Sequence, residues 1–306
     1  MLIKFFIISG LFLSTHAISQ IYNVDPSLLT DLKTLSSPKM QGRKTGSHGS
    51  KLAADYITVE FRKLKLQPLT KNYQQTFKYK SGFFSIKQGN NIISSLPAKN
   101  PNAPYIVFTA HYDHLGHSGS KIYYGADDNA SGVAAMLNIA KRLKQKELNY
   151  HYIFIATDAE EAGLYGSKEF LSSNLVNTKD IVLNINLDML AVAPKSRSLY
   201  AFSSKKMKPY KALIEVQSID GHAKTHFISS NRQMNAKQKK EKIDWRNASD
   251  HASFRKYKIP YIYYGVGTHK NYHTSNDTFE NIDTVFYQAV VNNIYQTVMS
   301  LDNYRL

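Results

Sequence analysis

Hydrophobic and polar residues along this chain follow two periods, which predict alternating strands and helices. Short, mostly apolar runs of the kind found in buried strands occupy residues 104–110, 152–156, 181–187 and 261–264. Apolar residues spaced three and four apart predict helices over 28–35, 53–66, 131–145, 166–172, 208–219 and 283–301. Alternation of the two kinds of element predicts a sheet that is at least partly parallel.

Two further stretches complete the predicted organisation. Alternating aromatic and polar residues over 73–93 predict a hairpin, and the basic stretch after residue 219 is expected to be irregular. Neither an internal repeat nor a linker interrupts the pattern. The sequence therefore predicts one α/β domain, a three-layer α/β/α sandwich with a central mixed, mostly parallel sheet.

The first 19 residues have a different pattern from the rest. Lys4 precedes an apolar run over 5–13, and small and polar residues follow it. This order is typical of a secretory signal peptide, and the run is shorter than the ~20 residues that span a bilayer. We therefore expect cleavage after Ala17 or Ser19, a single catalytic domain over 20–306, and a secreted or periplasmic protein that binds no membrane once the signal is removed.

The composition limits which side chains could bind a metal and which partners are expected. The chain of 306 residues has no cysteine, so any metal must be held by histidines and carboxylates. Its net charge of +16 raises the question of an anionic partner such as nucleic acid. The lysines are scattered without a nucleic-acid motif, however, and the densest run, 237–242, resembles a solvated loop insertion. We expect no nucleic-acid partner.

Histidines and carboxylates lie directly after predicted strands or on the loops between elements. The segments are His111-Tyr112-Asp113, Asp127-Asp128 before a helix, Glu160-Glu161, Asp188, and Tyr272-His273. The carboxyl ends of strands are where ligands bind in open α/β sheets. Taken singly, each segment has an ordinary explanation, such as helix capping by an aspartate or a surface histidine. In the first segment, a carboxylate two residues after a histidine suits a partner that accepts the imidazole N–H.

All five segments together resemble the di-zinc exopeptidase family that includes bacterial leucyl aminopeptidases, glutamate carboxypeptidase and glutaminyl cyclase. The resemblance extends from Gln41 to the last predicted helix. It implies two zinc ions, with His111 and Asp188 on one, Glu161 and His273 on the other, and Asp128 bridging both. Asp128 is preferred over Asp127 because the family's ligand lies three residues before a Ser-Gly pair, here 131–132.

The same resemblance implies roles for three further residues. Glu160 corresponds to the general base, Asp113 to the partner of His111, and Tyr272 to a tyrosine that contacts the substrate. In such a centre two zinc ions share a water, lower its pKa toward about 7, and leave its proton to the base. Residues 249–251, Ser-Asp-His, resemble a family segment near the active site but receive no role.

The expected function is that of a zinc-dependent aminopeptidase, a monomer whose partner is a peptide substrate. Three alternatives stay open. A glutaminyl cyclase works with one zinc, and a non-catalytic binding protein would be expected to have lost a ligand. A carboxypeptidase would need clustered arginines for the substrate carboxylate, and Arg232, Arg246 and Arg255 form no recognisable motif.

Overall fold

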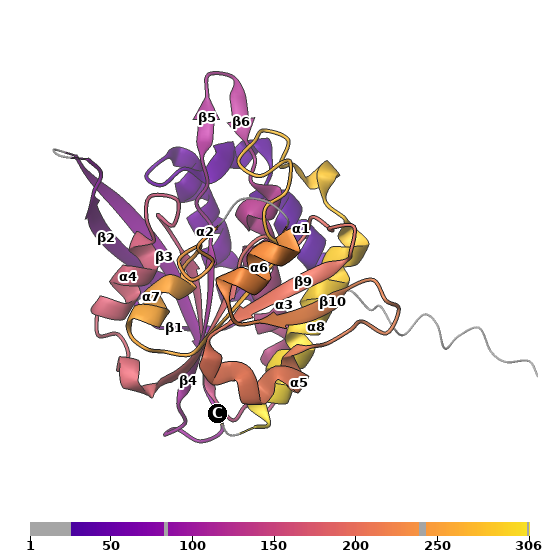
Figure 1. Ribbon diagram of the computed structural model, residues 1–306. Helices are drawn as coiled ribbons and strands as arrows, with labels where there is room; N and C mark the ends of the chain where they lie inside the picture. Colours follow the sequence, from indigo (N-terminus) through magenta and orange to yellow (C-terminus); the bar gives the residue numbers. More distant parts are fainter. Residues whose placement is uncertain (1–25, 83–84, 239–242, 305) are drawn as a thin grey trace, which may run out of the picture.

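The computed structural model describes residues 26–82, 85–238, 243–304 and 306. Within these ranges a nine-stranded sheet runs through the molecule (Figure 1). Its order is β1 (Gln67–Pro68), β3 (Ile86–Leu96), β7 (His151–Thr157), β4 (Tyr105–His111), β8 (Ile181–Leu187), β11 (Tyr261–Gly265), β9 (Ser198–Ser203) and β10 (Lys224–Ile228), with β2 (Gln74–Lys80) paired to β3. Strands β5 (Gly116–Ser118) and β6 (Lys121–Tyr123) form a separate hairpin.

The centre of the sheet is parallel and its margins are mixed. Strand β4 is parallel to β7 and β8, and β8 is parallel to β11. The hairpin partners β2 and β3 are antiparallel, as are the pairs β3–β7 and β11–β9. The four central strands are those that the apolar runs predict, because strands covered on both faces lack a polar side.

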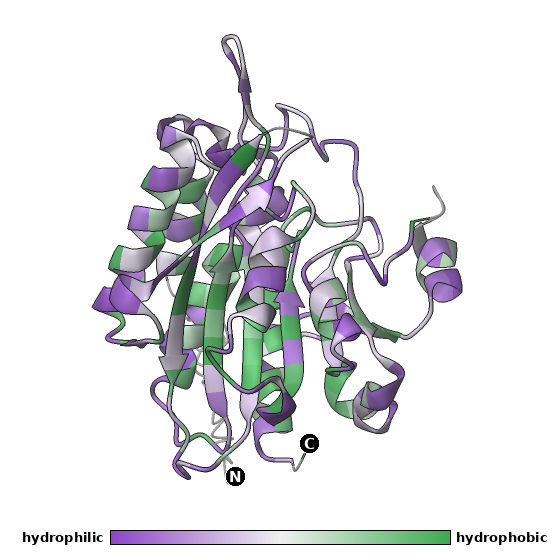
Figure 2. Cartoon of the chain, turned by 90° about the vertical axis from the view of Figure 1, so that its left-hand side faces the viewer, coloured by the Kyte–Doolittle hydropathy of each residue, from purple (hydrophilic) through white to green (hydrophobic). Residues whose placement is uncertain are grey.

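Helices cover both faces of this sheet and make three layers (Figures 1 and 2). One face carries α1 (Pro26–Leu35), α2 (His48–Lys63), α3 (Gly132–Leu143), α5 (Lys211–Ile214) and α8 (Thr284–Asp302). The other carries α4 (Tyr165–Ser172), α6 (Asn231–Gln238) and α7 (His251–Lys256). Alternate residues of β4 serve the two faces: Phe108 packs on the first side, and Val107 packs with Phe170 and Phe254 on the second. The predicted α/β/α sandwich is confirmed.

Two local predictions were wrong. The helix predicted over 208–219 is a 3-10 turn, Lys205–Tyr210, followed by the four-residue α5. Pro209 lies inside that turn and cannot donate a main-chain hydrogen bond, which disfavours a continuous α-helix. The stretch expected to be irregular contains β10 and α6. Residues 1–19, the predicted signal peptide, lie outside the described residues, and no helix within those residues is long and apolar enough to cross a membrane.

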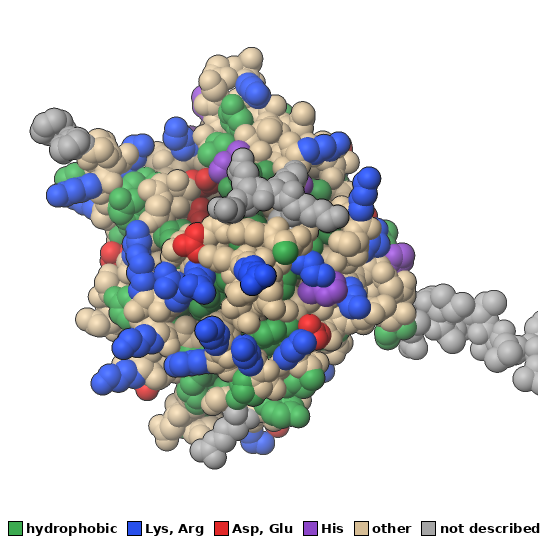
Figure 3. All heavy atoms as spheres, viewed as in Figure 1, with side chains coloured by type: hydrophobic (Ala, Val, Ile, Leu, Met, Phe, Trp, Pro, Cys, Tyr) green, Lys and Arg blue, Asp and Glu red, His purple; other side chains and the backbone are tan. Residues whose placement is uncertain are grey.

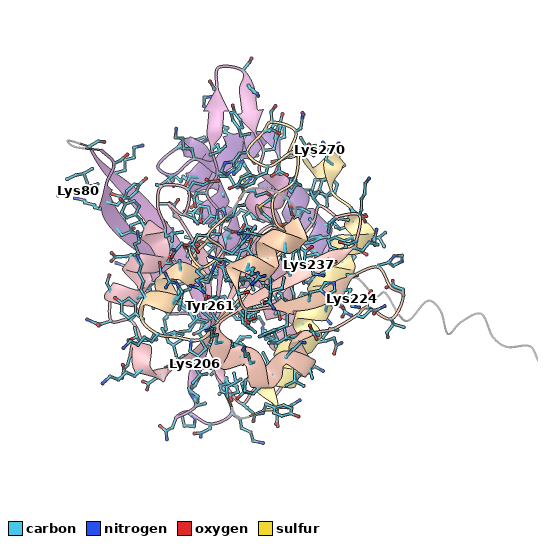
Figure 4. All side chains as sticks on the ribbon, in the orientation of Figure 1. Lys80, Lys206, Lys224, Lys237, Tyr261 and Lys270 are labelled. Carbon is cyan, nitrogen blue, oxygen red and sulfur yellow. The ribbon has the colours of Figure 1, made fainter. Side chains whose placement is uncertain are left out.

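Basic side chains are spread over the surface. Figure 3 shows Lys and Arg over much of one face, with acidic and histidine side chains near one another in its upper half. The lysines labelled in Figure 4 come from different parts of the fold: Lys80 lies on β2, Lys224 on β10, Lys237 on α6 and Lys270 on the loop after β11. The positive charge on this face is therefore distributed rather than gathered along one element.

Candidate metal centre

The predicted ligands come from separate segments that meet at one edge of the sheet. His111 ends β4, and Asp188 directly follows β8. Glu161 lies on the loop after β7, a strand parallel to β4, so these three segments end on the same side. The turn before α3 supplies Asp128, and the loop between β11 and α8 supplies His273. All five residues line one cavity of about 480 Å³.

Asp128 lies between two groups of donor atoms. On one side, His111 Nε2 is 3.3 Å from Asp128 Oδ1 and 3.5 Å from Asp188 Oδ1. On the other side, His273 Nε2 is 3.1 Å from Asp128 Oδ2 and 3.4 Å from Glu161 Oε2. Each group has one imidazole nitrogen, and each receives one oxygen of Asp128. The arrangement therefore matches two cation positions that share a carboxylate.

The bonding of these atoms also fits metal ions. Asp128 Oδ2 and Asp188 Oδ1 are buried and accept no hydrogen bond from the described residues, although imidazole nitrogens lie within 3.5 Å. Buried carboxylate oxygens without a partner are costly, and a shared cation removes that cost. Burial alone would lower the pKa of His273, but the carboxylates of Asp128 and Glu161 raise it to about 10. The surroundings of this ring thus favour a positive charge.

The tautomer of His111 leaves its second nitrogen free for a metal. Its Nδ1 lies 3.1 Å from the main-chain oxygen of Asp113, which accepts the N–H. The carboxylate of Asp113, predicted to be the acceptor, is farther away at 3.7 Å. It accepts main-chain hydrogen bonds from Glu160 and Glu161 instead, at 3.1 and 3.3 Å. Asp113 therefore orients His111 through its backbone and fixes the Glu160-Glu161 turn through its side chain.

Glu160 faces the same cavity but belongs to neither group of donor atoms. Burial raises the pKa of its carboxyl well above the usual value, and the neighbouring carboxylates of Asp188 and Asp250 raise it further, against the opposing effect of His111. A carboxylate with increased proton affinity beside the metal positions is suited to general-base catalysis. Tyr272 also lines this cavity, and its ring stacks on His273 with centroids 3.8 Å apart.

Asp127, which precedes Asp128 in the chain, makes contacts that hold the surrounding loops. Its Oδ1 accepts hydrogen bonds from the main chain of Ala191 and from Ser131. Its Oδ2 lies 3.0 Å from His269 Nε2, on the loop that carries His273. Asp277, at the end of that loop, accepts the main-chain N–H groups of both Asp127 and its neighbour. Neither His269 nor Asp277 is predicted from the sequence, because their partners are more than 100 residues away along the chain.

Arg43 is a second residue whose role emerges only from the structure. It is fully buried and donates to the main-chain oxygens of Leu35, Tyr112, Tyr124 and Gly125 at 2.6–2.8 Å. Burial lowers its pKa to about 10, so the side chain stays charged at neutral pH. A buried cation close to the acidic cavity offsets part of its negative charge, while the four hydrogen bonds hold the loops after β4 and β6 together.

The segment Ser249-Asp250-His251 supports the cavity wall. His251 is buried between the rings of Tyr261 and Tyr263, and its Nε2 donates to the main-chain oxygen of Trp245 at 2.8 Å. Trp245 lines the cavity. Burial lowers the pKa of His251 to about 4. The ring is therefore neutral at physiological pH, and it positions a wall residue without facing the metal positions.

Replacing His251 should change the acid stability of the metal-free protein. In the unfolded chain a histidine gains its proton near pH 6.5, but the folded protein resists this until about pH 4. Between these values the unfolded state binds more protons, so the free energy of unfolding falls as the pH falls. From pH 7 to pH 5 we expect urea unfolding to show a decrease about 2 kcal/mol larger for wild type than for His251→Gln. The exposed His117→Gln should behave as wild type, and equal decreases in wild type and His251→Gln would contradict the assignment.

Comparison with known proteins assigns the chain to a family. The sequence model of Peptidase family M28 matches residues 91–298, which hold the five candidate ligands. The chain belongs to this family. The resemblance predicted from the five segments is thereby confirmed.

Individual curated proteins match parts of the chain. The aminopeptidase YwaD of Bacillus subtilis is 34% identical over 185 residues, which cover 59% of this chain and 36% of that protein. The alkaline phosphatase isozyme conversion protein of Escherichia coli is 30% identical over 169 residues, 50% of this chain and 48% of the relative. The matches thus span about half, or less, of the length of these relatives.

Solved structures share the fold over nearly the whole chain. A Zn-dependent exopeptidase from Parabacteroides distasonis superposes with a TM-score of 0.68 at 20% identity, covering 93% of this chain and all of the other. A zinc aminopeptidase from Bacillus subtilis gives 0.63 at 19% identity, covering 90% and 94%. A glutaminyl cyclase from Porphyromonas gingivalis gives 0.66 at 21% identity, covering 90% and 97%. At these identities the likeness establishes the fold.

Proposed function

We propose that this M28 protein is an exported zinc aminopeptidase, acting as a monomer, which uses two zinc ions and Glu160 to remove N-terminal residues from peptides. The observation that carries the proposal is the charge of the cavity. Four carboxylates line it, from Asp128, Glu160, Glu161 and Asp188, and no Lys or Arg is among its described lining residues. Four carboxylates would offset the charge of the two zinc ions, and the described lining offers no Lys or Arg to pair with the negative carboxylate of a carboxypeptidase substrate.

Two metal positions on either side of Asp128 define the reacting centre. Zinc ions held there would polarise the scissile carbonyl and lower the pKa of a water. Glu160 would serve as the base that takes a proton from the attacking water and passes it to the leaving amine. Burial and the nearby Asp128 carboxylate raise the pKa of Tyr272, so its hydroxyl stays protonated and can donate to the substrate. His111 keeps its proton on Nδ1 throughout, held by the Asp113 carbonyl.

The arginines considered for a carboxypeptidase lie elsewhere. Arg246 and Arg255 line a different pocket, together with Lys205 and Tyr261. Arg232 lies on α6 and lines neither that pocket nor the metal cavity. A substrate carboxylate in the metal cavity would thus find none of these side chains around it, which disfavours the carboxypeptidase alternative.

The proposal can be tested with matched substrates. We expect hydrolysis of aminoacyl-anilides with free amino termini, none of their N-acetylated counterparts, loss of activity after chelation, and recovery with zinc. Cleavage of blocked and free substrates alike would contradict exopeptidase action from the amino terminus. Release of ammonia from N-terminal glutamine, with no anilide cleavage, would instead establish the cyclase alternative.

A further inference from the structure

A third histidine, His114, lies at the metal centre and belongs to none of the roles above. It follows β4, is buried, and its main-chain N–H donates to the main-chain oxygen of Arg43 at 3.3 Å. Its ring packs against Gly125, where a Cβ atom would come within 2.6 Å of His114 Cδ2. It also meets the ring of His273 edge-on, with centroids 5.9 Å apart. The imidazole is thus held in one place by its surroundings.

Two roles are compatible with the position of its Nδ1 atom. This nitrogen lies 3.1 Å from Glu161 Oε1 and 3.6 Å from Asp128 Oδ2. The three atoms are close enough together to surround a metal ion, which would make His114 a ligand. The contact with Glu161 also has the geometry of a hydrogen bond, which would make His114 a donor to a ligand.

The other ring nitrogen distinguishes these roles. His114 Nε2 is buried and has no hydrogen-bond partner among the described residues. If Nδ1 bound a metal, the proton of the neutral ring would lie on Nε2, leaving a buried N–H without an acceptor, which is unfavourable. With the proton on Nδ1, Nε2 is only an unused acceptor, which is better tolerated. His111 differs at its second nitrogen. Its Nδ1 donates to a carbonyl oxygen, and its Nε2 faces the carboxylates, where a metal would bind.

We propose that His114 is a positioning residue that donates its Nδ1–H to Glu161 Oε1. The bond fixes the carboxylate so that Oε2 stays directed toward His273 and Asp128, at the second metal position. Hydrogen bonds to metal ligands orient them and raise metal affinity. The inference rests on the proposed two-zinc centre. It adds a residue that supports the zinc held by Glu161 and His273 but not the zinc held by His111 and Asp188.

Nitrogen-15 NMR of the histidine rings tests the assignment directly. In ¹⁵N-histidine-labelled protein, metal-free and zinc-loaded, long-range proton–nitrogen spectra show which ring nitrogens are protonated, bare or metal-bound. We expect one nitrogen each of His111 and His273 to shift on zinc loading, and His114 to keep Nδ1 protonated and Nε2 bare. Signals are assigned by their loss in His111→Asn, His114→Asn and His273→Asn. Binding of zinc by His114 would overturn its positioning role, whereas no shift in any ring would overturn the two-zinc centre itself.

Zinc affinity provides a second readout. Competition with a chelator should show that His114→Ala weakens one of the two zinc ions by about 10- to 100-fold and leaves the other unchanged. His114→Asn keeps an amide N–H near the position of Nδ1 and should restore most of this affinity. His117→Asn, at an exposed position on β5, should match wild type. Unchanged affinity in His114→Ala, or equal losses in the Ala and Asn variants, would contradict the donor role.

Discussion

Glu160→Gln should lower kcat by about 10²–10⁴-fold while both zinc ions stay bound. The amide has nearly the same size as the carboxylate but cannot accept a proton at neutral pH. Glu160 also lies outside both groups of metal-binding atoms, so its replacement leaves the ligands in place. Steady-state kinetics and zinc content per chain, measured on the same preparation, test both parts of this expectation.

The matched control is Glu147→Gln, an exposed glutamate paired with Lys99 on the surface. It should retain full activity and the same zinc content as wild type. An active Glu160→Gln enzyme would exclude Glu160 as the base. Loss of zinc together with activity would instead make Glu160 a ligand.

Asp128→Ala should have the largest effect on metal content. Because Asp128 contributes an oxygen to each cation position, its loss weakens both sites at once. We expect at most one zinc per chain after dialysis, and a loss of affinity larger than the about 10- to 100-fold typical of residues that only support a ligand. Elemental analysis and chelator competition measure the two quantities.

Asp127→Asn, at the residue before Asp128, is the control variant for Asp128→Ala. Asp127 is equally buried, but its oxygens contact Ala191, Ser131 and His269 rather than the metal positions. The variant should keep two zinc ions and lose stability, because the contact with His269 is weakened. Retention of both zinc ions by Asp128→Ala, or their loss from Asp127→Asn instead, would show that the bridge was assigned to the wrong aspartate.

The hydrophobic pattern of the sequence predicts the central strands of the sheet but not the strands β9 and β10 at one edge. Strands β7, β4 and β8 are covered by helices on both faces, so they are mostly apolar runs that a single sequence reveals. Strand β9 is buried too, but it begins and ends with serine, and its neighbour β10 is only half buried. Their strand conformation depends on pairing with β11 and with each other, which is not a local property.

The candidate site was also only partly predictable from the sequence. The rule that ligands bind at the carboxyl ends of parallel strands predicts that His111, Glu161 and Asp188 lie close together. The family resemblance added which aspartate bridges and which glutamate is the base. The roles of Arg43 and His114 were not predicted from the sequence, because Arg43 binds main-chain oxygens that carry no sequence signal, and His114 acts through a single proton on one ring nitrogen.

The most direct test of the account is a crystal structure of the zinc-loaded protein with anomalous diffraction data at the zinc edge. We predict two anomalous peaks about 3.5–4 Å apart, one on each side of Asp128. One should contact His111 and Asp188, the other Glu161 and His273, with Glu160 contacting neither. A single peak, or two peaks that do not share Asp128, would contradict the two-zinc centre on which the proposed aminopeptidase activity depends.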